Sequence, residues 1–212
     1  MMFMSMCMGT AIGTGVVVSR YFGAKDQKNT AKAIANGAYV NVIVALINSS
    51  LMADEFIRGA KEAGHDAEKI YLTDKSVGGC LGCGACQRNG GQCVKKDDMN
   101  EIYEKVKNAD VIVFAFPVYF YTWNGQMKTV LDRLYAVEPL LKDKTFYMLA
   151  SGQAPTEEYM TTMIDSFRRY IGCFRAGGNT EGGFVFGYGT DKPGDVVGTS
   201  AMEKAYEMGR AL

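Results

Sequence analysis

Histidine is almost absent from this sequence, and neither sign of charge is in excess. The 212 residues contain a single histidine, His65, and 23 basic residues against 23 acidic ones. A hydrolase built on a Ser-His-Asp triad is therefore unsupported, because His65 sits at a predicted helix-terminal turn and no nucleophile elbow is present. The balanced charge gives no electrostatic argument for nucleic acid, so we expect no nucleic-acid partner.

The sequence also lacks the marks of a secreted protein. Its first residues have no positively charged region of the kind that opens a secretory signal. Four of its six cysteines lie together between Cys80 and Cys93, which is unlike the dispersed cysteines of a secreted disulfide framework. We therefore expect a cytoplasmic protein with reduced thiols.

Residues 1–41 form an atypical beginning. Residues 1–19 carry no charge, a basic stretch follows, and residues 33–47 are again mainly apolar. Apolar, basic, apolar is the layout of a helical hairpin. The stretch "IGTGVVVSRYFGAKDQKNTAKAIANGAYVNVIVALI" resembles the second-to-third helix segment of multidrug-and-toxin-extrusion transporters. We expect a helical extension over 1–41, with three readings open: a fused transporter fragment, an anchor with membrane contact through residues 1–47, or an amphipathic soluble extension.

From residue 42 onward, apolar runs alternate with helical patterns. The apolar runs predict strands at 41–47, 67–72, 110–116, 144–150 and 182–188. Helices are expected between them and at the end, and Gly64 is expected to end the first of these helices. Strands that alternate with helices predict an α/β fold with a doubly wound, five-stranded parallel sheet. The second domain is thus expected to cover 42–212, with a cysteine-rich insert at 76–96.

Ligands of such a sheet bind beyond the carboxyl ends of its strands, where the strand order reverses. Three loops leave those ends, and the loop after the strand at 110–116 is the most informative. It reads "PVYFYTWNGQMK" and places four aromatic residues between a strand and a helix. Aromatic side chains there can stack on a flat ring system, and Thr122 or Asn124 is placed to cap the helix. The alternative is an apolar loop that packs on a subunit neighbour.

The cysteine stretch "CLGCGACQRNGGQC" has the spacing C-x2-C-x2-C-x6-C. Three close thiolates and a fourth nearby suit a 4Fe–4S cluster, and the surrounding glycines let the backbone fold tightly around it. Structural zinc sites more often use two C-x2-C pairs on separate loops. Three interpretations stay open: a cluster, a zinc ion, or four reduced thiols. The candidate metal ligands are Cys80, Cys83, Cys86 and Cys93.

Several stretches in the right order are similar to the flavodoxin-like NAD(P)H-dependent FMN reductases, especially their iron–sulfur flavoprotein branch. They are "FIRGAKEAGHDAEKIYL", "CLGCGACQRNGGQCVKKDDMNEIYEKV", "ADVIVFAFPVYFYTWNGQMKTVLDR" and "PGDVVGTSAMEKAYEMG". The resemblance implies a flavodoxin-like sheet of order 2-1-3-4-5, bound FMN, NAD(P)H as co-substrate and a small-molecule or protein electron acceptor. It also implies a homodimer or higher homo-oligomer.

The residues expected at the flavin are Asn48, Ser49, Ser50, Pro117, Val118, Tyr119, Phe120, Tyr121, Thr122, Trp123, Asn124, Ser151 and Gly152. No acid or base is nominated, because hydride transfer to a flavin needs none.

The first loop departs from the family pattern. Relatives carry Gly-Ser-Pro-Arg and further polar residues there, whereas "ALINSSLMADEF" passes to the helix through Asn48, Ser49 and Ser50 alone. The phosphate-binding turn is thus shortened and lacks its arginine, which weakens the expected hold on FMN. The alternative to an FMN-dependent oxidoreductase is therefore a non-catalytic flavodoxin-like module that binds only a metal or a partner.

Overall fold

The computed structural model describes residues 47–174 and 176–212, which lie within one compact unit, Ile47–Leu212. The predicted extension over 1–41, and its membrane contact, lie outside these residues. None of the helices in the described part is long and apolar enough to cross a membrane.

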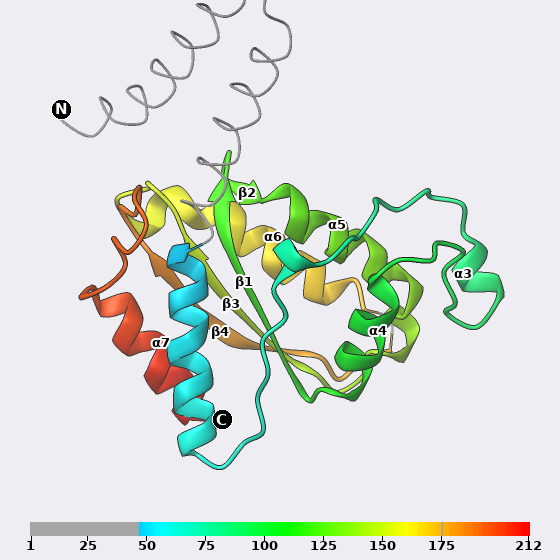
Figure 1. Cartoon of the computed structure of the whole chain (residues 1–212), viewed down its shortest axis with the longest axis horizontal. Coiled ribbons are helices and arrows are strands. Elements are labelled where there is room, and N and C mark those ends of the chain that lie inside the picture. The colour runs from blue at the N-terminus through cyan, green and yellow to red at the C-terminus, as the bar shows by residue number, and fades with distance from the viewer. Residues whose placement is uncertain (1–46, 175) are drawn as a thin grey trace, which may run out of the picture. The chain divides into compact units, whose positions relative to one another are not determined.

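A helix over residues 47–62 opens the described chain. The further elements are the α-helices α3 (Ala85–Arg88), α4 (Met99–Asn108), α5 (Gly125–Arg133), α6 (Thr161–Gly172) and α7 (Ser200–Arg210), the strands β1 (Val111–Tyr119), β2 (Thr122–Trp123), β3 (Thr145–Ser151) and β4 (Thr180–Gly187), and the 3-10 helices η1 (Leu72–Asp74), η2 (Leu134–Ala136), η3 (Glu138–Leu140) and η4 (Glu157–Met160). Figure 1 shows their arrangement around a central sheet.

The sheet within the described residues has four strands in the order β2-β1-β3-β4. β1, β3 and β4 are parallel neighbours, and the two-residue β2 pairs antiparallel with the end of β1. The predicted strands at 110–116, 144–150 and 182–188 are thereby confirmed, together with their adjacent order. The predicted flavodoxin-like α/β fold is present, although its sheet is mixed rather than wholly parallel.

The prediction of five strands is wrong for the described residues. Residue 47, the end of the predicted strand 41–47, is helical, and residues 41–46 lie outside the described part. Residues 67–71 form no ladder, and Leu72 begins η1. In the expected order the segment 67–72 pairs with the strand that ends at residue 47. Within the described residues this segment has no neighbouring strand, and the side chains of Ile70 and Leu72 pack on the core.

Helices cover both faces of the sheet, as Figure 1 shows. Side chains alternate along each strand, so that Phe146 and Met148 of β3 face the larger core while Tyr147 and Leu149 face the smaller one. The larger core also receives buried residues from α4, α5 and α6. The smaller core is closed by the helix over 47–62 and by α7.

The helix over 47–62 and α7 cross at two glycines. A Cβ built on Gly59 would lie 2.2 Å from the Tyr206 carbonyl oxygen, and one on Gly209 would lie 2.0 Å from the Phe56 carbonyl oxygen. Each glycine therefore contacts the backbone of the opposite helix, an approach that no larger residue permits. Gly64, with φ of 95°, follows the first helix and confirms its predicted end.

Candidate functional site

The carboxyl ends of three strands meet at one edge of the sheet. The register pairs Pro117 of β1 with Ser151 of β3, and Ser151 with Gly187 of β4. The Gly152 N–H then donates to the Gly187 carbonyl at 3.1 Å. The structure thus brings the predicted site residues Pro117, Val118, Ser151 and Gly152 together, which is the edge where ligands of open α/β sheets bind.

The aromatic loop is a tight hairpin at this edge. Phe120 and Tyr121 have φ of 49° and 63°, a conformation that hairpins usually assign to Asn-Gly. Large aromatic residues are strained there, and such strain is concentrated at functional sites. Phe120 is 96% exposed and Tyr121 56% exposed, so their ring faces are open to solvent.

Tyr119 and Thr122 form the base of the hairpin, where the two residues pair across β1 and β2. Partial burial raises the pKa of Tyr119 above its ordinary value. Its hydroxyl therefore stays protonated at neutral pH and can donate a hydrogen bond at the edge.

Trp123 and Asn124 face the protein interior rather than the edge. Trp123 is 6% exposed, packs on Phe114 and Phe116, and donates from Nε1 to the Ser166 hydroxyl at 2.9 Å. Asn124 Oδ1 accepts from the Met127 N–H at 3.3 Å, which confirms the predicted helix cap. Trp123 thus anchors the hairpin on the core, and the exposed rings are those of Phe120 and Tyr121.

Asn48 binds the loop that follows β4. Its Nδ2 donates to the Lys192 carbonyl at 2.8 Å, and its Oδ1 accepts from the Gly194 and Val196 N–H groups at 2.9 and 3.4 Å. The side chain is 2% exposed. Asn48 therefore has partners on both amide atoms within the protein, and a contact between Asn48 and FMN stays a prediction.

Ser49 and Ser50 lie in the helix over 47–62, in its first described turn. Ser49 is buried, whereas Ser50 is partly exposed. Lys69 Nζ donates to the Ser50 hydroxyl at 3.1 Å and also pairs with Asp54. Sequence reasoning missed Lys69, because a cation from the segment beyond the helix gives no local signal in the loop itself. The structure thus places a positive charge beside the predicted phosphate residues.

The loop after β4 supplies further residues that sequence reasoning missed. The Asp195 carboxylate accepts from the Asp191 and Lys192 N–H groups at 2.9 and 2.6 Å, and Gln153 Nε2 donates to Asp191. The Thr190 hydroxyl bonds the Gly187 carbonyl at 3.0 Å. The signal for this loop was the "PGDVVG" stretch, whose Pro-Gly-Asp sequence favours a turn.

The four predicted metal ligands line one concavity of about 120 Å³, together with Lys95 and Tyr135. All four cysteines are free thiols, with Cys80 and Cys83 exposed and Cys86 and Cys93 partly buried. In this conformation no three His, Cys, Asp or Glu side chains of the described residues lie close enough to hold a metal ion. The donor set nevertheless fits an iron–sulfur group, because it is all sulfur and surrounds a single hollow. Gly82 and Gly84, with φ of 63° and 62°, give the loop the freedom to close.

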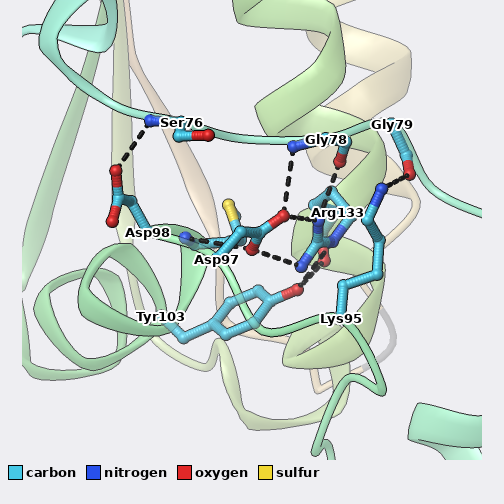
Figure 2. Close-up of polar contacts among 9 residues, drawn as sticks. Ser76, Gly78, Gly79, Lys95, Asp97, Asp98, Tyr103 and Arg133 are labelled. Atoms are coloured by element: carbon cyan, nitrogen blue, oxygen red, sulfur yellow. Dashed lines mark hydrogen bonds and ion pairs between the residues drawn. The ribbon is translucent and has the colours of Figure 1, made fainter.

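The base of the cysteine loop is a buried ionic network, drawn in Figure 2. Arg133, 1% exposed, donates from Nη1 to Asp97 Oδ2 at 2.7 Å and from Nη2 to Asp97 Oδ1 at 3.0 Å. Hydrogen bonding to Arg133 lowers the pKa of Asp97 to about 2. Burial raises the pKa of the neighbouring Tyr103 to about 12, although Arg133 pulls it down. Asp97 is therefore charged and Tyr103 neutral at physiological pH.

α5 connects the two places. It begins after the aromatic hairpin with its cap at Asn124 and ends with Arg133 beneath the cysteine loop, as Figures 1 and 2 show. Its nine residues span about 14 Å at 1.5 Å per residue. The predicted flavin residues and the predicted metal ligands are thus distinct groups, and α5 runs from the aromatic hairpin to the base of the cysteine loop.

Comparison with known proteins identifies the family. Residues 44–180 match the NADPH-dependent FMN reductase family. An iron–sulfur flavoprotein of Archaeoglobus fulgidus is 32% identical over 78% of this chain and 72% of its own length. Another, from Methanocaldococcus jannaschii, is 31% identical over 78% of this chain and 88% of its own length.

Solved structures agree in fold. An FMN-dependent NADH-azoreductase from Bacillus anthracis in complex with FMN has a TM-score of 0.57 and 19% identity, and the match covers 77% of this chain and 90% of that one. The chain therefore belongs to the NADPH-dependent FMN reductase family and is a flavin-dependent NAD(P)H oxidoreductase of the group that includes the iron–sulfur flavoproteins.

Proposed function

We propose that this protein oxidises NAD(P)H with FMN bound at the carboxyl edge of the sheet and delivers the electrons to an acceptor, with the cysteine loop as the site of a 4Fe–4S cluster. The observation that carries the proposal is the exposed aromatic hairpin, Tyr119 to Thr122, beside Ser151 and Gly152 at that edge. FMN, when bound, supplies the hydride-accepting chemistry, and the protein provides its seat.

The protein's own groups have three roles at this seat. The rings of Phe120 and Tyr121 offer stacking surfaces, and the Tyr119 hydroxyl offers a hydrogen-bond donor. Ser50 offers a hydroxyl for a phosphate, and Lys69, which bonds that hydroxyl and pairs with Asp54, offers a positive charge that a phosphate would share with Asp54. The apolar core around Trp123 excludes water from the side of the proposed FMN site that faces the protein interior.

The cysteine loop has the donors and the charge for a cluster. A 4Fe–4S cluster, when bound, supplies one-electron transfer. Cys80, Cys83, Cys86 and Cys93 would hold it. The segment 75–96 contains Lys75, Arg88, Lys95 and Lys96 and no acidic residue, so its positive charge offsets the negative charge that four thiolates gather.

The proposal is tested by FMN binding to the purified full-length chain. We expect quenching of FMN fluorescence and a rise in melting temperature, with weaker binding of riboflavin because it lacks the phosphate. Tyr119→Ala should weaken FMN binding about fivefold, since it removes a hydrogen-bond donor worth roughly 1 kcal/mol. Leu140→Ala, which shortens an exposed side chain of η3, is the matched control and should bind normally.

Failure of wild-type protein to quench FMN fluorescence or gain thermal stability at saturating FMN would overturn the flavin part of the proposal. Where FMN binds, FMN-dependent oxidation of NADH or NADPH in the presence of a quinone identifies the preferred donor. Iron and sulfide analysis after anaerobic purification tests the cluster separately.

A second candidate is a non-catalytic module that holds a metal group or a partner without flavin. The observation in its favour is Asn48, whose two amide atoms already bind the loop over 192–196. A visible spectrum separates the candidates, because bound flavin gives two bands and a cluster alone gives a broad brown absorbance. A brown protein that binds no FMN would favour the module.

A further inference from the structure

The two ends of the cysteine loop are bonded to each other below the four thiols. The Ser76 N–H donates to the Asp98 carboxylate at 2.7 Å, and the Gly78 N–H donates to Asp97 Oδ2 at 3.1 Å. Lys95 Nζ donates to the Gly79 carbonyl at 3.0 Å. Figure 2 shows these contacts side by side, so the chain enters and leaves the loop through a closed neck.

Arg133 is the centre of this neck although it comes from α5. Besides its two bonds to Asp97, it donates from Nη1 to the Gly78 carbonyl at 2.7 Å and from Nε to the Tyr103 hydroxyl at 3.3 Å. Tyr103 in turn donates to the Arg133 carbonyl at 3.0 Å. The Arg133 guanidinium thus contacts Gly78 where the chain enters the loop, Asp97 where the chain leaves it, and Tyr103 of α4.

We infer that Asp97 and Arg133 are positioning residues for the four thiols: their ion pair closes the neck of the cysteine loop and thereby limits the arrangements from which Cys80, Cys83, Cys86 and Cys93 can gather around one metal group. The thiol ligands themselves belong to the proposed function, on which this inference rests; the clamp does not touch the metal and acts through the loop backbone.

The energetics favour a geometric role over a merely stabilising one. A buried ion pair loses hydration that its attraction often fails to recover, so apolar residues would stabilise the same position at least as well. A bidentate arginine–carboxylate pair instead fixes the direction and the distance between the guanidinium and the carboxylate. The loop above the neck gains from such a constraint, because it contains Gly82, Gly84, Gly90 and Gly91, and glycine restricts the backbone less than any other residue.

The Cys93 thiol adjoins the same network. Cys93 is partly buried and packs against the core cluster that contains Tyr103. A shift of the neck would therefore move Cys93 directly and the other three cysteines through the loop. Groups that orient metal ligands in this way typically change metal affinity by 10- to 100-fold when they are removed.

The experiment uses the full-length, metal-free chain and Co²⁺ alone as the probe, because Co²⁺ bound by four thiolates gives a characteristic absorption. The variants are Asp97→Asn, Arg133→Met and Arg133→Lys. Arg168→Met is the matched control, since Arg168 makes a similar forked pair with Glu181 at 2.7 and 3.0 Å between α6 and β4. Hydrogen exchange of residues 79–95 is measured on the same samples without metal.

We expect Asp97→Asn and Arg133→Met to weaken Co²⁺ binding by about 10- to 100-fold and to alter its visible bands, while exchange rises in 79–95 and not in β3. Arg133→Lys should recover part of the affinity, because it keeps the charge and loses the fork. Arg168→Met should match wild type. Asp97→Asn keeps the shape of the side chain, so the test holds even where Arg133→Met fails to fold.

The outcomes separate the two proposals. Wild-type protein that binds no Co²⁺ or iron, with exchange in 79–95 raised by Asp97→Asn, refutes the cluster and leaves the clamp standing. Normal Co²⁺ affinity, unchanged bands and unchanged exchange in Asp97→Asn and Arg133→Lys would overturn the clamp, whatever cofactor the protein binds.

Discussion

At the scale of single residues, the Asp97–Arg133 pair is the clearest electrostatic feature of the described chain. Arg133 is almost completely buried, and burial alone would lower its pKa, but its bonds to Asp97 and Tyr103 raise it instead. Both members of the pair are therefore charged at neutral pH. This pairing also makes the stability of the protein sensitive to acid.

Asp97 should contribute stability that acid removes. Its pKa falls from 3.8 to about 2 in the folded state, a difference worth about 2 kcal/mol. Because the folded pKa is depressed, this contribution is complete above the unfolded pKa of 3.8 and is lost as pH falls from there toward 2. Urea unfolding between pH 5 and 2 should show this loss in wild type, and Asp97→Asn should have a flatter profile. Identical profiles for the two proteins would contradict the assignment.

Phe120 and Tyr121 carry strain that a different turn would relieve. Positive φ costs a large L-residue about 1 kcal/mol or more, whereas Asn-Gly adopts this turn readily. The double variant Phe120→Asn, Tyr121→Gly should therefore raise the free energy of unfolding by about 1 kcal/mol and weaken FMN binding, since two rings are lost. Chemical denaturation and FMN titration measure the two effects. Tyr121→Phe keeps ring and strain, so it should change neither; a destabilised double variant would argue against strain.

At the scale of the elements, the crossing of the helix over 47–62 with α7 is the tightest contact. Gly59 and Gly209 each face the backbone of the other helix, so neither helix can relax without moving the other. The smaller core beneath them, with Met52, Phe56 and Ala205, depends on this approach. The two helices thus act as one layer on their face of the sheet.

Gly209→Ala should destabilise the protein even though alanine favours helix. The new methyl group would lie 2.0 Å from the Phe56 carbonyl oxygen, and the resulting separation of the helices costs about 1–3 kcal/mol. Gly172→Ala is the matched control, because no atom lies within 4 Å of the Cβ position in that last residue of α6. The control should be neutral or slightly stabilising in thermal unfolding. Equal melting temperatures for both variants would rule out the close crossing.

The elements also show what the sequence could and could not predict. β1, β3 and β4 were predictable because they are apolar runs bounded by turn residues, and such strands are recognisable from their own composition. The segment 67–72 has strand composition too, but a strand exists only with a neighbour, and pairing is not a local property. The cap at Asn124 was predictable because it depends on a contact three residues away.

The site was predictable to the extent that it is local. The aromatic loop and the cysteine spacing are contiguous in sequence, so both were predictable as candidate sites, whereas the hairpin shape of the loop was not predicted. Arg133, Lys69 and the role of Asn48 depend on contacts with residues 36, 19 and more than 140 positions away. No local sequence pattern predicts such distant partners. The burial of Arg133 in particular contradicts the usual expectation that an arginine in a helix is exposed.

At the scale of the whole molecule, Asn48 joins the beginning of the described chain to its end. Its amide bonds the Lys192 carbonyl and the Gly194 and Val196 N–H groups. The loop over 192–196 leads into α7, and both lie against the helix over 47–62. The carboxyl edge of the sheet therefore keeps its shape through one buried side chain.

Asn48→Ala should lower the free energy of unfolding by about 2–4 kcal/mol, because it leaves three backbone groups without that partner. Asn48→Asp keeps the two bonds that Oδ1 accepts but has no N–H donor for the Lys192 carbonyl. A protonated carboxyl can donate to that carbonyl instead, so the loss of stability should be smaller at pH values where the new carboxyl is protonated. Urea denaturation compares the three proteins, and hydrogen exchange should rise in 190–198 for Asn48→Ala. A change below 0.5 kcal/mol with protected amides would contradict this role.

The distance along the chain that Asn48 bridges has a consequence for biosynthesis. The helix over 47–62 leaves the ribosome early, yet its packing partners, the loop over 192–196 and α7, are the last described parts to be made. Contacts so remote in sequence form late and slow the folding of a domain. The part of this helix's apolar face that does not pack on β3 therefore stays uncovered until the loop over 192–196 and α7 have been made, and until then a chaperone can bind it.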